Sequence, residues 1–262
     1  MIPIDQIRNY FPAQIRGNSG FDKHILKEYL QLMILDYLSS TPHIKKMAFI
    51  GGTNLRLLKG IDRFSEDLDF DCKEMSNDEF VEMTNGVIQF LERSGLRVVA
   101  KDKENPRLTA FRRNLHFPEL LFDLGLSGHK EERFLIKVES QDQGIVNPPV
   151  IKNIKGCGFF FPFPVPSDGV LCSMKISAML ARAKGRDFYD LMFLLSQAKP
   201  DYGFLSKRFE IKSLQAFKQA TVELLKKVDL KKKQKDFEHL LFNKANSEKI
   251  LRFGEFVESL TE

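Results

Sequence analysis

Residues 67–72 alternate strictly between acidic and apolar side chains, in the order Asp-Leu-Asp-Phe-Asp-Cys. Successive side chains of a β-strand point to opposite faces, so this pattern predicts a strand with Asp67, Asp69 and Asp71 on one face. The apolar residues between them would face a core. Three neighbouring carboxylates repel one another unless a cation lies among them, and Mg²⁺ prefers carboxylate oxygens. The segment therefore predicts a half-buried strand that can hold a divalent metal.

A glycine turn precedes this strand. The apolar run 47–50 ends at Gly51, Gly52 and Thr53, and two residues without a Cβ permit a sharp turn and a close approach to a ligand. Thr53 is expected to cap a helix over 54–59. Free backbone N–H groups at such a helix start suit a phosphate. We therefore expect this turn to bind a nucleotide.

Two further candidates lie beside these segments. Residues 134–140 alternate again and predict a second strand. If that strand pairs with the acidic one, Glu139 adds a third acid to the metal; on an edge strand it would be an exposed surface residue. Ser65, two residues before Asp67, could donate its hydroxyl to a phosphate oxygen, or it could be an ordinary loop serine. The residues alone leave both alternatives open.

The carboxyl-terminal half contributes two charged positions. Ser167 and Asp168 predict the start of a helix that carries Lys175, and a second predicted helix carries Asp190. A lysine directed into an acidic, metal-bearing site could neutralise a triphosphate. By composition alone, however, Lys175 would be one of many surface lysines.

Three segments together resemble the AbiEii-type nucleotidyltransferases, the toxin halves of abortive-infection and related toxin–antitoxin pairs, within the polymerase-β-like superfamily. The resemblance covers roughly residues 48–195, and its motifs are the Gly-Gly-Thr-x-Leu-Arg-Leu turn from Gly51, the segment Arg63 to Phe70, and the segment Lys175 to Leu191. Each motif alone is weak, whereas the combination is specific.

This resemblance implies roles for single residues. Asp67 and Asp69 would hold Mg²⁺ or Mn²⁺, and Lys175 and Asp190 would act at the active site. Glu139 would be the carboxylate of the neighbouring strand, where family members often have Asp. The implied reaction is Mg²⁺-dependent nucleotidyl transfer from an NTP.

The resemblance also implies the partners. Such toxins modify RNA, in some members by adding nucleotides to the 3′ end of tRNA, and they are encoded with a cognate antitoxin. Two alternatives stay open: the same chemistry on a small molecule such as an aminoglycoside or on a protein hydroxyl, and a non-catalytic nucleotide-binding partner. Neither the preferred nucleotide nor the acceptor is encoded in a recognisable motif.

The fold class expected from these patterns is α+β. Residues 1–150 would form a nucleotidyltransferase-like mixed β-sheet with helices, and residues 151–262 a linker followed by a helical bundle. The proline- and phenylalanine-rich segment 147–166 is interpreted as that linker. A run of six lysines in residues 226–235 could follow an RNA backbone or be a solvated helix end.

Composition sets the remaining expectations. A net charge of +5 over 262 residues fits a nucleic-acid or nucleotide partner, although many proteins share it. We expect no membrane span and no signal peptide, hence a cytoplasmic protein. Three cysteines without metal-site spacing are expected to be reduced thiols.

Overall fold

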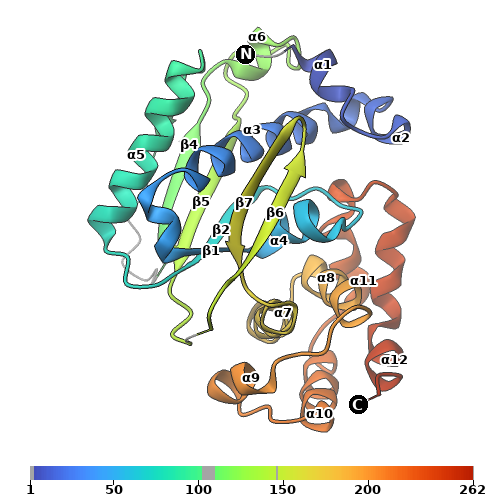
Figure 1. The fold of residues 1–262 in the computed structure, drawn as a ribbon. Helices are drawn as coiled ribbons and strands as arrows, with labels where there is room; N and C mark the ends of the chain where they lie inside the picture. The colour runs from blue at the N-terminus through green and yellow to red at the C-terminus, as the bar shows by residue number, and fades with distance from the viewer. Residues whose placement is uncertain (1–2, 102–109, 146, 262) are drawn as a thin grey trace. The chain divides into compact units, whose positions relative to one another are not determined.

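The computed structural model describes residues 3–101, 110–145 and 147–261. The chain forms two compact units. The first comprises residues 1–60, 64–144 and 149–165, and the second comprises residues 61–63, 145–148 and 166–262. The first unit contains the sheets and the second is helical, so the predicted α+β class is confirmed (Figure 1).

A five-stranded mixed sheet forms the centre of the first unit, in the order β1-β2-β5-β4-β3. The acidic strand β2 pairs antiparallel with β1 and parallel with β5. The second alternating segment therefore lies beside β2 in the interior of the sheet and not at an edge. The strands are β1 (Met47–Ile50), β2 (Asp67–Cys72), β3 (Val99–Ala100), β4 (Phe111–His116) and β5 (Leu135–Gln141).

The two faces of this sheet differ in polarity as the alternation predicts. On β2, Leu68 and Phe70 are 0% and 1% exposed, while Asp67 and Asp69 are partly exposed. The buried face packs against helix α5 (Asn77–Arg93), which contacts β4, and helix α3 (Asp22–Ser39) packs against α5 (Figure 1). An antiparallel or mixed sheet covered on one side produces this division of side chains.

Local capping signals fix the helices of the first unit. The side chain of Ser76 accepts a hydrogen bond from the Glu79 N–H, and the Glu79 carboxylate accepts one from the Ser76 N–H. This reciprocal capping box starts α5. The shorter helices of this unit are α1 (Ile4–Arg8), α2 (Ala13–Arg16), α4 (Gly51–Asn54) and α6 (Leu120–Asp123).

The segment that we interpreted as a linker forms a β-hairpin of the first unit. Strands β6 (Val150–Gly156) and β7 (Phe159–Val165) pair antiparallel, and β7 packs against β1 and α3. Pro162 and Pro164 are two residues apart, so their backbone nitrogens, which carry no hydrogen, can both point away from the partner strand β6. Phe161 and Phe163 are buried and attach the hairpin to the core.

The second unit consists of helices with side-chain caps at several starts. The hydroxyl of Ser167 accepts a hydrogen bond from the Val170 N–H and starts α7, as predicted. Asp201 and Ser213 cap α9 and α10 in the same way. The helices are α7 (Asp168–Arg182), α8 (Gly185–Leu195), α9 (Tyr202–Phe209), α10 (Leu214–Leu225), α11 (Leu230–Lys235) and α12 (Phe253–Glu258).

Other expectations concern the membrane and the cysteines. Within the described ranges, no helix combines the length and the apolar character that a membrane span requires. Cys72, Cys157 and Cys172 are buried free thiols, and burial raises the pKa of each to about 12. Such thiols are poor nucleophiles near neutral pH.

Replacement of Phe163 by alanine tests whether the hairpin is part of the core. Phe163 is 0% exposed, and its ring centroid lies 5.9 Å from that of Phe49 and 6.0 Å from that of Phe70. We expect Phe163→Ala to lower the free energy of unfolding by ~3–5 kcal/mol, measured by urea denaturation. Phe160 is 68% exposed, so Phe160→Ala should change it by less than about 0.5 kcal/mol. Equal effects of the two variants would contradict this packing.

Candidate active site

The carboxylates of β2 occupy two different environments. Asp71 is 7% exposed and accepts a hydrogen bond from the Gln143 N–H at 2.9 Å, with Lys73 Nζ at 3.2 Å. Asp67 and Asp69 lie on the same face of the strand but are partly exposed. The third acid of the alternation thus has a structural partner, while the first two remain accessible on the polar face of the sheet.

Gly51 lies directly against the Asp69 carboxylate. Its φ is +82°, and a Cβ at this position would lie 2.1 Å from Asp69 Oδ2. Only glycine meets both conditions, because the conformation is left-handed and the space is already filled. The sequence therefore places a glycine where backbone and carboxylate approach each other.

Thr53 has a different role from the predicted one. Helix α4 begins at Gly51 and continues as a π-helical turn over Leu55–Lys59, so Thr53 lies inside the helix and does not cap it. Its hydroxyl donates a hydrogen bond to the Asp67 carbonyl oxygen. This bond joins the glycine turn to the acidic strand. Gly52 lies in the first turn of α4, and the first N–H groups of a helix have no intrahelical acceptor.

Glu139 lies beside the aspartates, as the parallel pairing of β2 and β5 requires. Asp69 is its register partner on β2. The Glu139 carboxylate is 2.6 Å from Arg112 Nε, and Lys137 Nζ lies 3.6 Å from Glu139 and 3.3 Å from Asp67. The polar face therefore carries acids and cations in alternation across strands, which relieves the repulsion among the acids.

The donor chemistry of this face suits a hard divalent cation. Asp67 and Asp69 offer carboxylate oxygens at adjacent positions of one strand face, and Mg²⁺ takes such ligands. Among residues 3–101, 110–145 and 147–261, however, no three His, Cys, Asp or Glu side chains converge on one point. Glu139 is held by Arg112, so its addition to a metal site requires an exchange of partners.

Ser65 lies in the loop before β2 and is half-buried. Its backbone carbonyl accepts a hydrogen bond from the Gln31 side chain at 3.2 Å. This bond connects the loop to α3 and sets the position from which β2 begins. The role of the Ser65 hydroxyl stays a prediction.

In the second unit, Asp190 is the centre of a buried ionic cluster. Its carboxylate accepts two hydrogen bonds from Arg63, at 2.7 and 2.6 Å, and one from Lys175 Nζ at 2.6 Å. Arg63 and Asp190 are 1% and 0% exposed, and Lys175 is 7% exposed. Burial by itself would raise the pKa of Asp190, but the charges and hydrogen bonds of Arg63 and Lys175 outweigh it and lower the pKa to about 2.

Neighbouring contacts extend this cluster. The hydroxyl of Tyr189 donates to Asp62 at 2.6 Å, and the Asn246 side chain donates to the other Asp62 oxygen at 2.6 Å. Asp187 accepts two hydrogen bonds from Arg182, which connect α7 and α8. Residues 61–63 are thereby bound into the helical unit.

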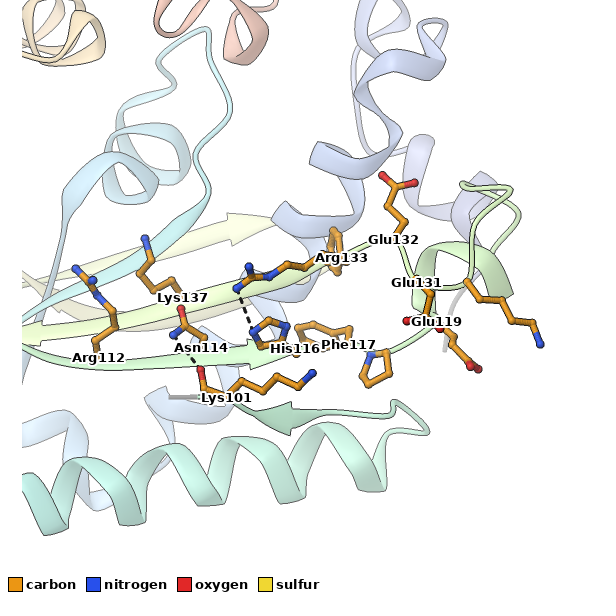
Figure 2. Close-up of a pocket in the computed structure, with 13 residues that line it drawn as sticks. Lys101, Arg112, Asn114, His116, Phe117, Glu119, Glu131, Glu132, Arg133 and Lys137 are labelled. Carbon is orange, nitrogen blue, oxygen red and sulfur yellow. Dashed lines mark hydrogen bonds between the residues drawn. The ribbon is translucent and has the colours of Figure 1, made fainter. Parts of the chain in front are cut away.

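A cavity of about 780 Å³ opens on the polar face of the sheet next to Lys137 (Figure 2). Its lining includes the cationic side chains of Lys101, Arg112, Lys130, Arg133 and Lys137, together with His116. The sequence analysis assigned no function to these residues. The alternation of Arg112, Asn114 and His116 along β4 is the signal that could have identified them, since it places all three on one face.

With this geometry in view, the comparisons with known proteins decide the family. The model of the family described as "Nucleotidyl transferase AbiEii toxin, Type IV TA system" matches residues 34–257. The chain belongs to the AbiEii nucleotidyltransferase toxin family. It is a nucleotidyltransferase, and the family implies an NTP substrate and an antitoxin partner.

Solved structures share the fold. The nucleotidyltransferase toxin MenT4 from Mycobacterium tuberculosis H37Rv aligns with a TM-score of 0.63 at 17% identity, covering 100% of this chain and 91% of that one. JHP933 from Helicobacter pylori aligns with a TM-score of 0.53 at 21% identity, covering 90% of each chain. A putative nucleotidyltransferase from H. pylori aligns with a TM-score of 0.53 at 20% identity, covering 89% of this chain and 92% of that one. Among curated proteins, none matches.

Two glycines with the same backbone conformation provide a test of the turn. Gly51 and Gly60 have φ values of +82° and +74°, but a Cβ at Gly60 would meet nothing within 4 Å. Gly51→Ala and Gly60→Ala should each lose ~1–2 kcal/mol of stability. Only Gly51→Ala should displace Asp69 and lower the rate of nucleotidyl transfer, on the order of a hundredfold. Equal activities of the two variants would show that the close approach is unimportant.

The buried cluster predicts a pH-dependent stability. Because the pKa of Asp190 is lowered to about 2, its carboxylate stabilises the fold above about pH 4, and this stabilisation is lost as the pH falls toward 2. Asp190→Asn should cost ~3–5 kcal/mol at neutral pH, because two buried cations lose their partner. The difference from wild type in urea denaturation should shrink as the pH falls below 4.

A surface variant serves as the control for this series. Asp236 is 48% exposed, and its Oδ2 lies 3.7 Å from Lys233 Nζ. Asp236→Asn should change the free energy of unfolding by less than about 1 kcal/mol at every pH. An equal loss of unfolding free energy in Asp190→Asn at pH 7 and at pH 3 would contradict the lowered pKa of Asp190.

Proposed function

We propose that this AbiEii-family protein transfers a nucleotide from an NTP to an RNA acceptor, tRNA being the expected class, and so acts as a toxin that stops translation. An RNA acceptor of this kind places the reaction in the cytoplasm. The cognate antitoxin would oppose it, and defence against phage by abortive infection is the corresponding biological role.

The observation that carries the proposal is the approach of Gly51 to Asp69. A Cβ on Gly51 would lie 2.1 Å from Asp69 Oδ2, so the backbone of the glycine turn and the carboxylate are adjacent. A nucleotidyltransferase needs both a phosphate-binding backbone and a metal-binding carboxylate. Backbone N–H groups without a side chain in front of them can bind phosphate oxygens. Carboxylates beside them can hold the cation that accompanies those phosphates.

Each residue then has a proposed part. Gly51 and Gly52 bind the phosphates through their backbone, with the turn held in place by Thr53, and Ser65 donates its hydroxyl to a phosphate oxygen. Asp67 and Asp69 hold Mg²⁺ or Mn²⁺, with Glu139 as a further ligand once it leaves Arg112. When bound, the metal stabilises negative charge on the phosphates and lowers the pKa of a coordinated hydroxyl.

Lys175 is proposed to neutralise the triphosphate, and Asp190 is proposed to act through it. Asp190 is 0% exposed and saturated by three short hydrogen bonds, so its contribution is to fix the position and charge of Lys175. Arg63 supplies the second positive charge that keeps Asp190 ionised.

The chemical step needs no covalent intermediate. The hydroxyl oxygen of the acceptor attacks the α-phosphorus of the NTP, the bond to the bridging oxygen breaks, and pyrophosphate leaves. Most of the catalysis in this class comes from positioning and electrostatic stabilisation. The turn, the carboxylates and the lysine supply both.

Label transfer from each α-labelled NTP to total cellular RNA tests the proposal. We expect label in an RNA band with wild-type protein and Mg²⁺, none with EDTA, and at least a ~100-fold lower rate for Asp69→Asn. Lys175→Gln should raise the KM for the NTP. Asp71→Asn is the matched control on the same strand face, since Asp71 bonds to Gln143 and Lys73, and it should retain activity.

The acceptor is decided by the same experiment. Label that enters protein or a small molecule instead of RNA would replace the RNA proposal by one of the alternative acceptors. NTP and metal binding without any transfer would favour a non-catalytic nucleotide-binding protein.

A further inference from the structure

The cationic cavity beside the acidic strand has charges that are unevenly distributed. Figure 2 shows Arg112, Lys137 and Arg133 at the end of the cavity where β4 and β5 carry the polar face, whereas Glu119, Glu131 and Glu132 lie at the other end. The cationic end is also the end that touches the candidate site, because Lys137 and Arg112 bind Glu139 and Lys137 binds Asp67. The cavity and the carboxylates therefore form one continuous polar surface of the first unit.

Two of the three glutamates of the lining have cationic partners outside it. Arg97 lies 2.8 Å from Glu119, and Lys23 binds Glu132. Their charges are thus partly compensated by residues that do not line the cavity. Arg112 and Lys137 likewise have acidic partners outside the lining. The lining itself still carries more lysine and arginine than glutamate side chains, which favours an anionic occupant.

The side chains that line the cavity include groups that bind phosphate well. Arg133 Nη2 lies 3.5 Å from His116 Nε2, so the ring contacts the guanidinium and helps to hold it beside the sheet (Figure 2). A planar guanidinium binds phosphate oxygens through two parallel hydrogen bonds. Lys101 adds a second cation from the strand edge beside Asn114, whose amide donates to the Lys101 carbonyl at 3.2 Å.

The strand order separates this cavity from the glycine turn. The turn follows β1 and approaches Asp69 from that side of β2, whereas the cavity lies over β5 and β4, on the other side of β2. In phosphoryl transfer the attacking and leaving oxygens are roughly in line across the reacting phosphorus. If pyrophosphate leaves toward the turn, the attacking hydroxyl must enter from the side of the cavity.

We propose that this cavity binds a backbone phosphate of the acceptor nucleic acid strand, close to the hydroxyl that is extended, through Arg133 and Lys101 with His116 as a positioning residue. The proposal rests on the proposed function, since it assigns the acceptor side of the same site. A volume of about 780 Å³ is within the range of pockets that take nucleotide-sized ligands. An aminoglycoside, being a polycation, would be repelled by this lining.

The test compares the double variant Lys101→Gln/Arg133→Gln with wild type. Binding of a short fluorescent single-stranded RNA is measured by anisotropy at several salt concentrations, and NTP binding is measured separately. We expect the Kd for RNA to rise about tenfold and the slope of log K against log salt to fall by roughly 0.7, the change for the one phosphate that the variant no longer neutralises. The Kd for NTP should stay within about twofold of wild type.

A matched control removes the same charge elsewhere in the first unit. Lys152 and Lys155 are exposed on β6 and do not line the cavity, so Lys152→Gln/Lys155→Gln should bind RNA nearly as wild type does. An equal loss in both double variants would show that only the net charge matters and would overturn the assignment.

Other outcomes also decide the proposal. Weaker NTP binding with unchanged RNA binding would assign the cavity to the triphosphate, and no change in either would show that it binds no phosphate. Absence of RNA binding by wild type at low salt would likewise overturn it. If wild type binds RNA but labels none, the proposed function fails, whereas the effect of the variants on RNA binding still decides the phosphate site.

Discussion

The separation of polar and apolar side chains on the two faces of β2 is the constraint on which the rest of the molecule depends. A slip of one residue in the pairing of this strand would turn its three carboxylates toward the apolar core and expose Leu68 and Phe70. The aromatic contacts of Phe49, Phe70 and Phe163 on the apolar face oppose such a slip. The same packing that stabilises the sheet therefore fixes which way the candidate metal ligands point.

The burial and the ion pairs of the acidic side chains, both on the polar face of the sheet and in the helical unit, determine which of them can exchange partners. Asp71, Asp187 and Asp190 are buried, and each accepts hydrogen bonds from fixed partners. Asp67 and Glu139 are partly exposed and are matched by Lys137 and Arg112 on adjacent strands. Partly exposed ion pairs contribute little net stability, so their replacement by a divalent cation and a nucleotide would cost the fold little. Exposure thus distinguishes the acids suited to binding from those suited to architecture.

Local sequence patterns predicted the parts of this structure that depend on neighbours along the chain. The alternation of β2 and the serine cap of α7 are each encoded within six residues, and both were predicted. The hairpin was missed because its prolines argue against regular structure, while the pairing that tolerates them arises only between β6 and β7. The cationic cavity was missed because the alternation along β4 indicates only that its polar side chains share one face, whereas the pairing with β5 arises in the fold.

The buried cluster around Asp190 gives this carboxylate a structural role that the sequence motif does not specify. Asp190 and Lys175 both belong to a motif that resembles the active site of a family, and both were predicted to be catalytic. In the fold, Asp190 is 0% exposed and accepts hydrogen bonds from Arg63 and Lys175, so direct contact with a substrate would require these hydrogen bonds to rearrange. Lys175 donates one hydrogen bond to Asp190, and an ammonium group has three donors. The geometry therefore favours a lysine that can act and an aspartate that holds it in place.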